Sequence, residues 1–238
     1  MKRVAVLQSN YLPWKGYFDI IHDADEFIFY DEVQFTKNDW RNRNILIVNG
    51  KPQWITVPVG TNIKQRIVDV RITDHAWQRK HYMTMRMNYA HAPHFKKFIS
   101  FFEDAFIGHT WEYLYQLNRY LIENIAQSFL GIRTKFSDSR DYISQGEKNE
   151  KLLSLLQSVG TDVYISGPAA KGYIRENDYS NAGIEIIWKD YDGYPVYPQK
   201  SEQFTHFVSI VDLLFNVGDD ASYYIWGWRG ETGLSTNK

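Results

Sequence analysis

Residues 4–18 read VAVLQSNYLPWKGYF, an apolar run followed by a polar and aromatic turn and then by the start of a helical pattern. The run at 4–7 is bounded by polar residues and predicts a buried strand. A helix is predicted over about 16–23, and a second apolar run at 27–30 predicts another strand. Strand, loop, helix and strand within about thirty residues predict a βαβ unit, the building block of α/β folds.

The residues that follow predict a hairpin and a group of helices. Asn49-Gly50 lies between two β-rich runs, which is the strongest short signal for a β-hairpin, here over about 44–59. Alternation of apolar and polar residues at 67–72 predicts one more strand. Apolar and aromatic residues at three- and four-residue spacing then predict a helical insertion over about 75–131.

The last third of the chain returns to alternating elements. Helices are predicted over 146–159 and 207–215, and strands at 163–165 and 184–187. There is no internal repeat and no linker-like segment. The sequence therefore predicts a single α/β domain over 1–238, with a Rossmann-like mixed sheet, a β-hairpin and a helical insertion.

The composition of the 238-residue chain excludes several classes of protein. Lys plus Arg is 27 and Asp plus Glu is 28, so a net charge of −1 lacks the basic field of a general nucleic-acid binder. The absence of cysteine excludes disulfides, a thiolate metal site and a Cys nucleophile. With no long apolar run and no secretory-signal pattern, we expect a cytoplasmic protein without a membrane span. Aromatic residues make up 16%, which suits either a ring-rich core or a site for a carbohydrate or nucleotide.

The polar turn after the first predicted strand is the first candidate site. Ligands of open α/β sheets bind beyond the carboxyl ends of the strands, and a helix N-terminus at that place favours an anion. Amide side chains can exchange hydrogen bonds there, and rings can stack on a ligand. A tight turn filled by aromatic residues explains the same segment equally well. The candidates for substrate binding are Gln8, Asn10, Tyr11 and Trp14.

The polar segment 31–44 follows the second predicted strand and should lie near the first loop. Asp31 stands at the strand end, where a general base or a metal ligand would be useful. Arginine grips phosphate or carboxylate through two parallel hydrogen bonds. The alternative is a solvated entry to the hairpin with local ion pairs. The candidates for substrate binding in this segment are Gln34, Lys37, Trp40, Arg41 and Arg43.

Histidines supply the next candidates. His81 lies one helical turn after Trp77, and a histidine is the usual general base near neutral pH. A packed or solvated histidine is the simpler alternative. His91 and His94 are three residues apart, but no carboxylate stands at ligand spacing, so we expect no metal.

A late loop, 165–173, also follows a predicted strand and contains small residues that allow a ligand to approach the backbone. Ser166 is its candidate binding residue. The loop lacks the lysine–hydroxyl ending of a P-loop, and no Gly-x-Gly-x-x-Gly occurs in the chain. We therefore expect no familiar nucleotide fingerprint.

Several of these motifs together resemble the WbqC-like family. The resemblance rests on residues 8–18, 30–35 and 40–44, and it extends through Asn88-Tyr89, Ala92-Pro93, Ser166-Gly167, Tyr197-Pro198-Gln199 and 209–218. It therefore covers nearly the whole chain. One departure is Ser9, where the family pattern usually has proline. The resemblance implies a presumed role in the synthesis of bacterial surface polysaccharide (O-antigen), and no established catalytic residues can be transferred from it.

The function expected on this basis is N-acylation of a nucleotide-linked amino sugar by an activated acyl donor. Asp31 or His81 would take the proton from the amine, and Lys37, Arg41 and Arg43 would bind the pyrophosphate. No Cys and no Ser–His–Asp pattern favour direct attack on the donor. Two alternatives stay open at this point: a nucleotidyltransferase or ATP-dependent ligase, and a non-catalytic protein that binds nucleotide sugars. The sequence identifies neither the sugar nor the cofactor.

Overall fold

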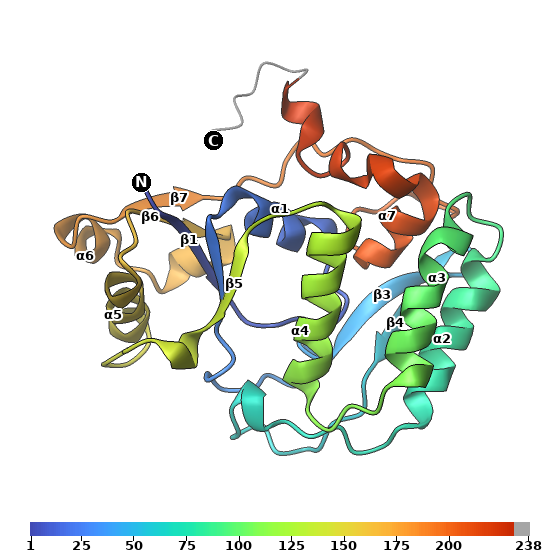
Figure 1. The fold of residues 1–238 in the computed structure, drawn as a ribbon, viewed down its shortest axis with the longest axis horizontal. Coiled ribbons are helices and arrows are strands. Elements are labelled where there is room, and N and C mark those ends of the chain that lie inside the picture. The colour runs from blue at the N-terminus through green and yellow to red at the C-terminus, as the bar shows by residue number, and fades with distance from the viewer. Residues whose placement is uncertain (231–238) are drawn as a thin grey trace.

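The computed structural model describes residues 1–230. Its main sheet consists of five parallel strands in the order β5-β2-β1-β6-β7 (Figure 1). The chain passes from β1 to β2 on one side and later returns to β6 on the other side of β1. The point where the strand order reverses therefore lies between β1 and β6, which is where open α/β sheets bind ligands. The strands are β1 (Arg3–Leu7), β2 (Glu26–Phe29), β5 (Lys135–Asp138), β6 (Val163–Ser166) and β7 (Glu185–Trp188).

Alternate residues of the strands face two different hydrophobic cores, because successive side chains of a strand point to opposite sides. Val4 and Val6 pack in a core with the leucines of α5. Ala5, between them, packs in the larger core on the other face with Phe18 of α1 and residues of the C-terminal helices. The sheet is thus covered by helices on both faces, which confirms the predicted α/β fold (Figure 1).

Within residues 1–230, seven α-helices surround the sheet and the hairpin. The helical stretch in the middle of the chain is present as predicted, and α3 and α4 each continue into a wider π-helical turn, Asp104–Gly108 and Ile125–Phe129. Among the described residues, no helix combines the length and the apolar composition that crossing a membrane requires. The helices are α1 (Lys15–Asp23), α2 (Ala76–Tyr89), α3 (Phe95–Glu103), α4 (Leu114–Asn124), α5 (Asn149–Val159), α6 (Glu176–Asn181) and α7 (Ile210–Val217).

The predicted hairpin stands apart from the main sheet as an antiparallel pair, β3 (Arg43–Val48) and β4 (Lys51–Thr56). Its two-residue turn has φ of 50° at Asn49 and 77° at Gly50. Positive φ at both turn residues matches the twist of the strands and explains the Asn-Gly pair. The antiparallel strands of the fold are therefore in this hairpin and not in the main sheet.

The strand predicted at 67–72 is wrong. Ile67–Asp69 form a single turn of 3₁₀ helix. The backbone N–H of Val68 donates to Asp31 O and that of Ile67 donates to Val33 O. The segment therefore closes the loop after β2, because its donors are used there and cannot enter a ladder of strand hydrogen bonds.

Candidate functional site

The loops that follow β1 and β2 meet through one arginine. Arg41 donates from Nη1 to Oδ1 of Asn10 (2.8 Å) and from Nη2 to Oε1 of Gln8 (3.0 Å). The backbone also joins the loops, because Tyr11 N–H donates to Trp40 O at 2.9 Å. The expectation that two loops after neighbouring parallel strands lie together is confirmed for these residues.

Arg41 keeps much of its positive charge available. Both of its close partners are neutral amides, and the carboxylate of Asp39 stands 3.8 Å away and is itself one-third exposed. Burial raises the pKa of Tyr173, in the loop after β6, and Arg41 opposes that rise, so the guanidinium also lies near this hydroxyl. Arg41 is therefore a held cation near the reversal point of the sheet, an arrangement that suits an anionic ligand.

An aromatic pocket of about 220 Å³ opens beside Asn10. The rings of Trp14 and Phe207 stack with centroids 5.7 Å apart, and Trp40 supplies a further wall. Phe207 is 66% exposed and Trp40 is 39% exposed, which is unusual for rings that could be buried. Flat apolar walls with amide groups between them fit a sugar or a base. The pocket is lined by Asn10, Pro13, Trp14, Trp40, Asn44 and Phe207.

The loop that carries the pocket is held by a buried amide. Asn44 Nδ2 donates to the carbonyl oxygens of Tyr11 (3.1 Å) and Leu12 (2.8 Å). Leu12 is fully buried and has a φ of 44°, in the left-handed region that a branched residue rarely adopts. The hydrogen bonds from Asn44 help to hold this strained turn, which places Pro13 and Trp14 at the pocket.

His81 lies at a second and larger hollow, a groove of about 720 Å³ between β4 and α2. Its side chain is buried, and its Nδ1 is 2.8 Å from the hydroxyl of Tyr11. Burial, with a smaller effect of nearby Lys80, lowers the pKa of His81 to about 3, so the ring is neutral at pH 7. Because Nδ1 faces Tyr11, Nε2 is the nitrogen left for a ligand in the groove.

Arg43 and Trp54 connect the two hollows. The guanidinium of Arg43 lies over the ring of Trp54, 4.1 Å from its centroid, and Trp54 in turn contacts Trp40 at 5.1 Å. Trp40 lines the pocket and Trp54 lines the groove. The Trp40–Trp54 pair is therefore the wall shared by the two hollows.

Asp31, the second candidate base, is fully buried beneath the loops. It accepts from Ser9 N–H (2.7 Å) and from Nε of Arg119 (2.8 Å), and Arg119 also pairs with Asp138. Burial raises the pKa of Asp31, although Arg119 and the Ser9 hydrogen bond oppose the rise. This arrangement joins the ends of β1, β2 and β5 and suits a structural role at least as well as proton transfer.

The remaining predicted residues lie around the site with different exposures. Gln34 is exposed and donates to Ile63 O, which turns it toward the 60–66 loop. Lys37 is exposed on the same segment. Ser166 is buried at the end of β6, and its hydroxyl donates to Tyr164 at 3.2 Å. The structure thus groups Gln8, Asn10, Trp14, Trp40 and Arg41, whereas the other candidates surround them.

Three pocket residues, Pro13, Asn44 and Phe207, were not among the predicted ones. Pro13 directly precedes the predicted residue Trp14 in the first loop. Asn44 lies within the segment 40–44 that carries the family resemblance, so its residue type and position could have indicated a place in the site. Phe207 follows the pocket's other residues by more than 160 positions and reaches Trp14 only through the fold. Nothing in its local sequence indicates this contact.

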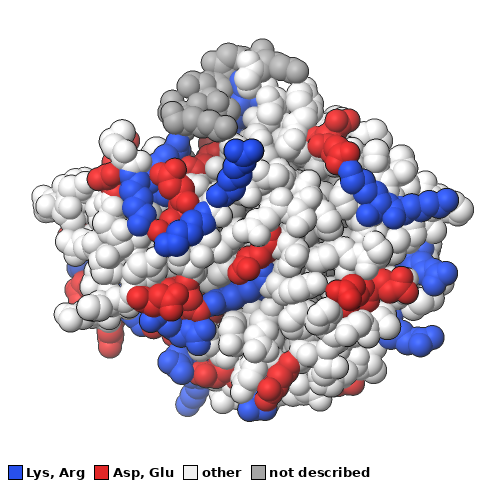
Figure 2. All heavy atoms as spheres, in the orientation of Figure 1, with Lys and Arg blue, Asp and Glu red and all other residues white. Residues whose placement is uncertain are grey.

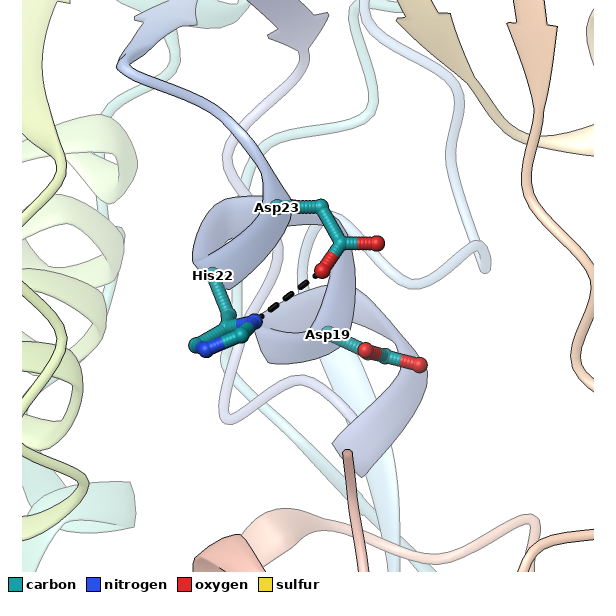
Figure 3. Close-up of side chains that lie close together, drawn as sticks. All are labelled: Asp19, His22 and Asp23. Carbon is teal, nitrogen blue, oxygen red and sulfur yellow. Dashed lines mark hydrogen bonds and ion pairs between the residues drawn. The ribbon is translucent and has the colours of Figure 1, made fainter. Parts of the chain in front are cut away.

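One group of side chains has the composition of a metal site. Ligand atoms of Asp19, His22 and Asp23 on α1 lie within 4.8 Å of one another (Figure 3). The ammonium of Lys189, however, is 2.8 Å from Asp19 and 2.5 Å from Asp23, and Arg229 also pairs with Asp19. A metal ion would meet these two cations, so the donor set does not fit one. The cluster instead ties α1 to the C-terminal part of the described chain.

Three of the motifs quoted for the family resemblance, Asn88-Tyr89, Tyr197-Pro198-Gln199 and 209–218, converge on a buried carboxyl group. Asp212 accepts hydrogen bonds from Tyr89 (2.9 Å), Tyr197 (2.7 Å) and Gln199 (2.8 Å). Tyr89 also accepts from Ile47 N–H. This network connects α2, α7 and the hairpin, and it explains these motif residues as the support of the groove.

These features define a class of protein: an α/β fold with a five-stranded parallel sheet, whose amide, aromatic and arginine side chains gather beyond the carboxyl ends of β1 and β2. The model of the WbqC-like protein family matches residues 8–224, and the chain belongs to this family. The uncharacterized protein Rv1507c of Mycobacterium tuberculosis is 42% identical over 227 residues, which cover 94% of this chain and 98% of that protein. No solved structure gives a significant match.

Proposed function

We propose that this protein is an enzyme that transfers an acyl or aminoacyl group onto the amine of a nucleotide-linked amino sugar for surface polysaccharide. The observation that carries the proposal is Arg41, a cation held by the neutral amides of Gln8 and Asn10 beside an aromatic pocket. A nucleotide sugar offers the matching pair of chemistries, a diphosphate and flat rings. The chain belongs to the WbqC-like family, and the role in surface-polysaccharide synthesis that the resemblance implies is consistent with the same choice.

The charge on the surface supports a small anionic ligand. On the face shown in Figure 2, Lys and Arg alternate with Asp and Glu, and no broad area of one sign is visible. A polyanion such as a nucleic acid calls for a basic stripe. A single held arginine matches the two phosphates of one nucleotide. The chain has no cysteine and therefore no disulfide that would call for an oxidising compartment, and we place the proposed reaction in the cytoplasm.

In the proposed reaction the amine attacks the acyl carbon directly. His81 is the proposed acceptor of the proton that the amine releases, and Tyr11 orients its ring. Asn10 accepts from Arg41 through Oδ1, so its Nδ2 is a donor for the oxyanion or the sugar. Asp31 is the alternative base. The two oxygens of Asp31 are engaged by Ser9 and Arg119, whereas His81 lines the groove, so His81 is the better candidate.

The test is calorimetric binding of UDP, dTDP and GDP, followed by UDP- and dTDP-linked amino sugars. We expect at least one diphosphate to bind and Arg41→Ala to weaken it by about ten- to a hundredfold, the effect of losing a charged hydrogen bond. Lys96→Ala, an exposed cation on α3, is the matched control and should bind as the unaltered protein does. Equal affinity of Arg41→Ala and Lys96→Ala would remove the proposed anion site.

Turnover separates an enzyme from a binding protein. With an acyl donor supplied, we expect formation of an amide without consumption of ATP. Amide formation only when ATP is cleaved would favour the ligase alternative, and binding without any product would favour a non-catalytic protein.

A further inference from the structure

The groove between β4 and α2 has an unusual wall, the backbone edge of a strand. Residues 53–56 of β4 all line it, together with a helical stripe of α2 that includes Trp77, His81 and Thr84. Side chains of a strand alternate between its faces, so four consecutive residues line one hollow where the strand presents its edge.

The register of the hairpin shows which backbone groups lie on that edge. Ile47 N–H donates to Tyr89, and Ile45 O accepts from Ser209 N–H, so both residues direct their backbone groups away from β4. Ile45 pairs with Trp54 across the hairpin, and in an antiparallel ladder both members of such a pair point outward. Thr56 lies two residues further and points the same way.

These outward groups are available to a ligand. Within residues 1–230, neither Trp54 nor Thr56 makes a backbone hydrogen bond on this side of β4. Pro52, the preceding outward residue, has no N–H to offer, which fits the edge position of a proline. A free strand edge binds an extended chain that carries its own amides, as in the recognition of peptides by strand addition.

We propose that the groove binds the phosphopantetheine arm of an acyl thioester, so that the acyl donor of the proposed reaction is a thioester. This inference rests on the proposed function. The arm is an extended chain with two amides, and it can pair with Trp54 and Thr56. Gln53 to Thr56 and Pro58 line the wall, and at about 3.3 Å per residue the stretch from Gln53 to Pro58 is roughly 17 Å long, which suits such a chain. Lys80, on the opposite wall, is a cation for the phosphate.

The position of His81 fits the reacting end of this donor. The amine attacks the carbonyl carbon, a C–N bond forms, and the C–S bond breaks as the thiolate leaves. The attacking nitrogen becomes positively charged as the C–N bond forms, and one of its protons passes through His81 to the thiolate, which gives an amide and a free thiol. No oxidant, reductant or metal is needed for this balance. The shared Trp40–Trp54 wall places the amino-sugar pocket next to the donor groove.

The arm could come from coenzyme A or from an acyl carrier protein, and binding measurements distinguish the two. Coenzyme A, 4′-phosphopantetheine and a holo-carrier protein are titrated separately into the full chain. We expect 4′-phosphopantetheine to bind. If coenzyme A binds more tightly than 4′-phosphopantetheine, the free cofactor is the source of the arm. If the holo-carrier protein binds more tightly, the carrier is the source. Absence of binding by all three overturns the proposal.

Two variants test the groove itself. Thr56→Pro removes the outward N–H, whereas Thr56→Val keeps it and removes only the hydroxyl, so we expect about tenfold weaker binding of 4′-phosphopantetheine to the first than to the second. Thr84→Arg fills the groove from α2, with Ser100→Arg on α3 as its control. The proposal is overturned if the two members of each pair bind 4′-phosphopantetheine equally well. It is also overturned if an unrelated N-acetylated tripeptide binds the unaltered protein as tightly as 4′-phosphopantetheine does.

The Thr56 and Thr84 variants also keep the two proposals apart. Binding of the nucleoside diphosphate found in the first titration depends on Arg41 and should be unchanged in both variants, which also shows that they are folded. Loss of arm binding with intact diphosphate binding supports the groove. Absence of binding by UDP, dTDP and GDP with intact arm binding would remove the nucleotide-sugar part alone.

Discussion

The hydroxyl of Tyr11 lies 2.8 Å from Nδ1 of His81, so the first loop of the sheet touches the helix of the insertion seventy positions later. Both side chains are buried, and the Tyr11 ring also contacts Trp77 on the same helix. Tyr11 follows Asn10 of the aromatic pocket, and His81 faces the groove. This hydrogen bond therefore links the two hollows that the proposed reaction needs, in addition to the Trp40–Trp54 contact.

Tyr11→Phe should destabilise the fold by about 1–3 kcal/mol, because it leaves Nδ1 of the buried His81 without its partner. The ring that packs against Trp77 is kept, so the loss reports the hydrogen bond. Urea unfolding at pH 7.5 measures it. Turnover should also fall, since the imidazole is no longer oriented.

His81→Asn and the double variant Tyr11→Phe/His81→Asn complete a cycle that isolates the pair. The two single losses of stability should add up to more than the loss in the double variant, because each single change removes the same hydrogen bond. Additive losses would show that Tyr11 and His81 stabilise the fold independently.

The stability of the protein should rise with pH between about 3 and 6.5 because of His81. Burial, with a smaller effect of Lys80, lowers its pKa from the ordinary 6.5 to about 3, so within this window the unfolded chain binds a proton that the folded chain does not. The contribution is fully present above pH 6.5 and is lost as the pH falls. Between pH 7.5 and 5 it amounts to about 2 kcal/mol.

Urea unfolding of the unaltered protein and of His81→Asn at both pH values tests this. In His81→Asn, the free energy of unfolding should lack most of this rise of about 2 kcal/mol between pH 5 and 7.5. Burial lowers the pKa of His206 to about 4, and Lys15 adds to the effect, so His206 contributes in the same direction and remains in both proteins. An identical pH dependence in the two proteins would show that His81 is protonated alike in the folded and unfolded chain.

The sequence predicted the elements whose signals are local. The apolar run at 4–7, the Asn49-Gly50 turn and the helical spacing of 75–131 all depend on near neighbours, and they appear as β1, the β3–β4 hairpin and α2 to α4. The edge strand β5 was not predicted, because Phe136 is its only apolar residue and its charged ends carry no strand pattern. Local periodicity also misplaced 67–72, where the fold uses the backbone donors elsewhere.

One part of the site could be predicted from the sequence, because the carboxyl ends of neighbouring parallel strands lie at the same edge of a sheet. That rule brought the loop at 8–14 and the segment 31–44 together, and the contact of Arg41 with Gln8 and Asn10 follows from it. Phe207 and the free edge of β4 arise from contacts across the fold and carry no sequence signal. The roles of His81 and Asp31 remain predictions.

Asp31→Asn should destabilise the protein by about 3–5 kcal/mol, because it removes a carboxylate that pairs with Arg119 and is fully buried. The amide can still accept from Ser9, so the loss reports mainly the charge. Asp141→Asn, at an exposed position, is the control and should change stability little. Thermal unfolding compares the two variants. A fully stable Asp31→Asn protein without turnover would instead favour Asp31 as the base.

The ion-pair cluster around Asp19 should hold the fold together without a metal ion. Asp19 is fully buried and faces both Lys189 and Arg229. The substitution Asp19→Asn leaves the two cations with one carboxylate, that of Asp23. It should destabilise the folded protein by about 3–5 kcal/mol. Asp220→Asn, exposed near the same end of the chain, should have little effect.

Chelation separates this explanation from a metal site. Since Lys189 and Arg229 already neutralise the carboxylates, excess EDTA should leave the melting temperature unchanged, and added zinc or magnesium should not raise it. Asp19→Asn should therefore melt at a lower temperature than Asp220→Asn by the same difference with or without chelator. A stoichiometric metal in the purified protein, removed by EDTA together with several degrees of thermal stability and absent from Asp19→Asn, would show that the cluster binds an ion.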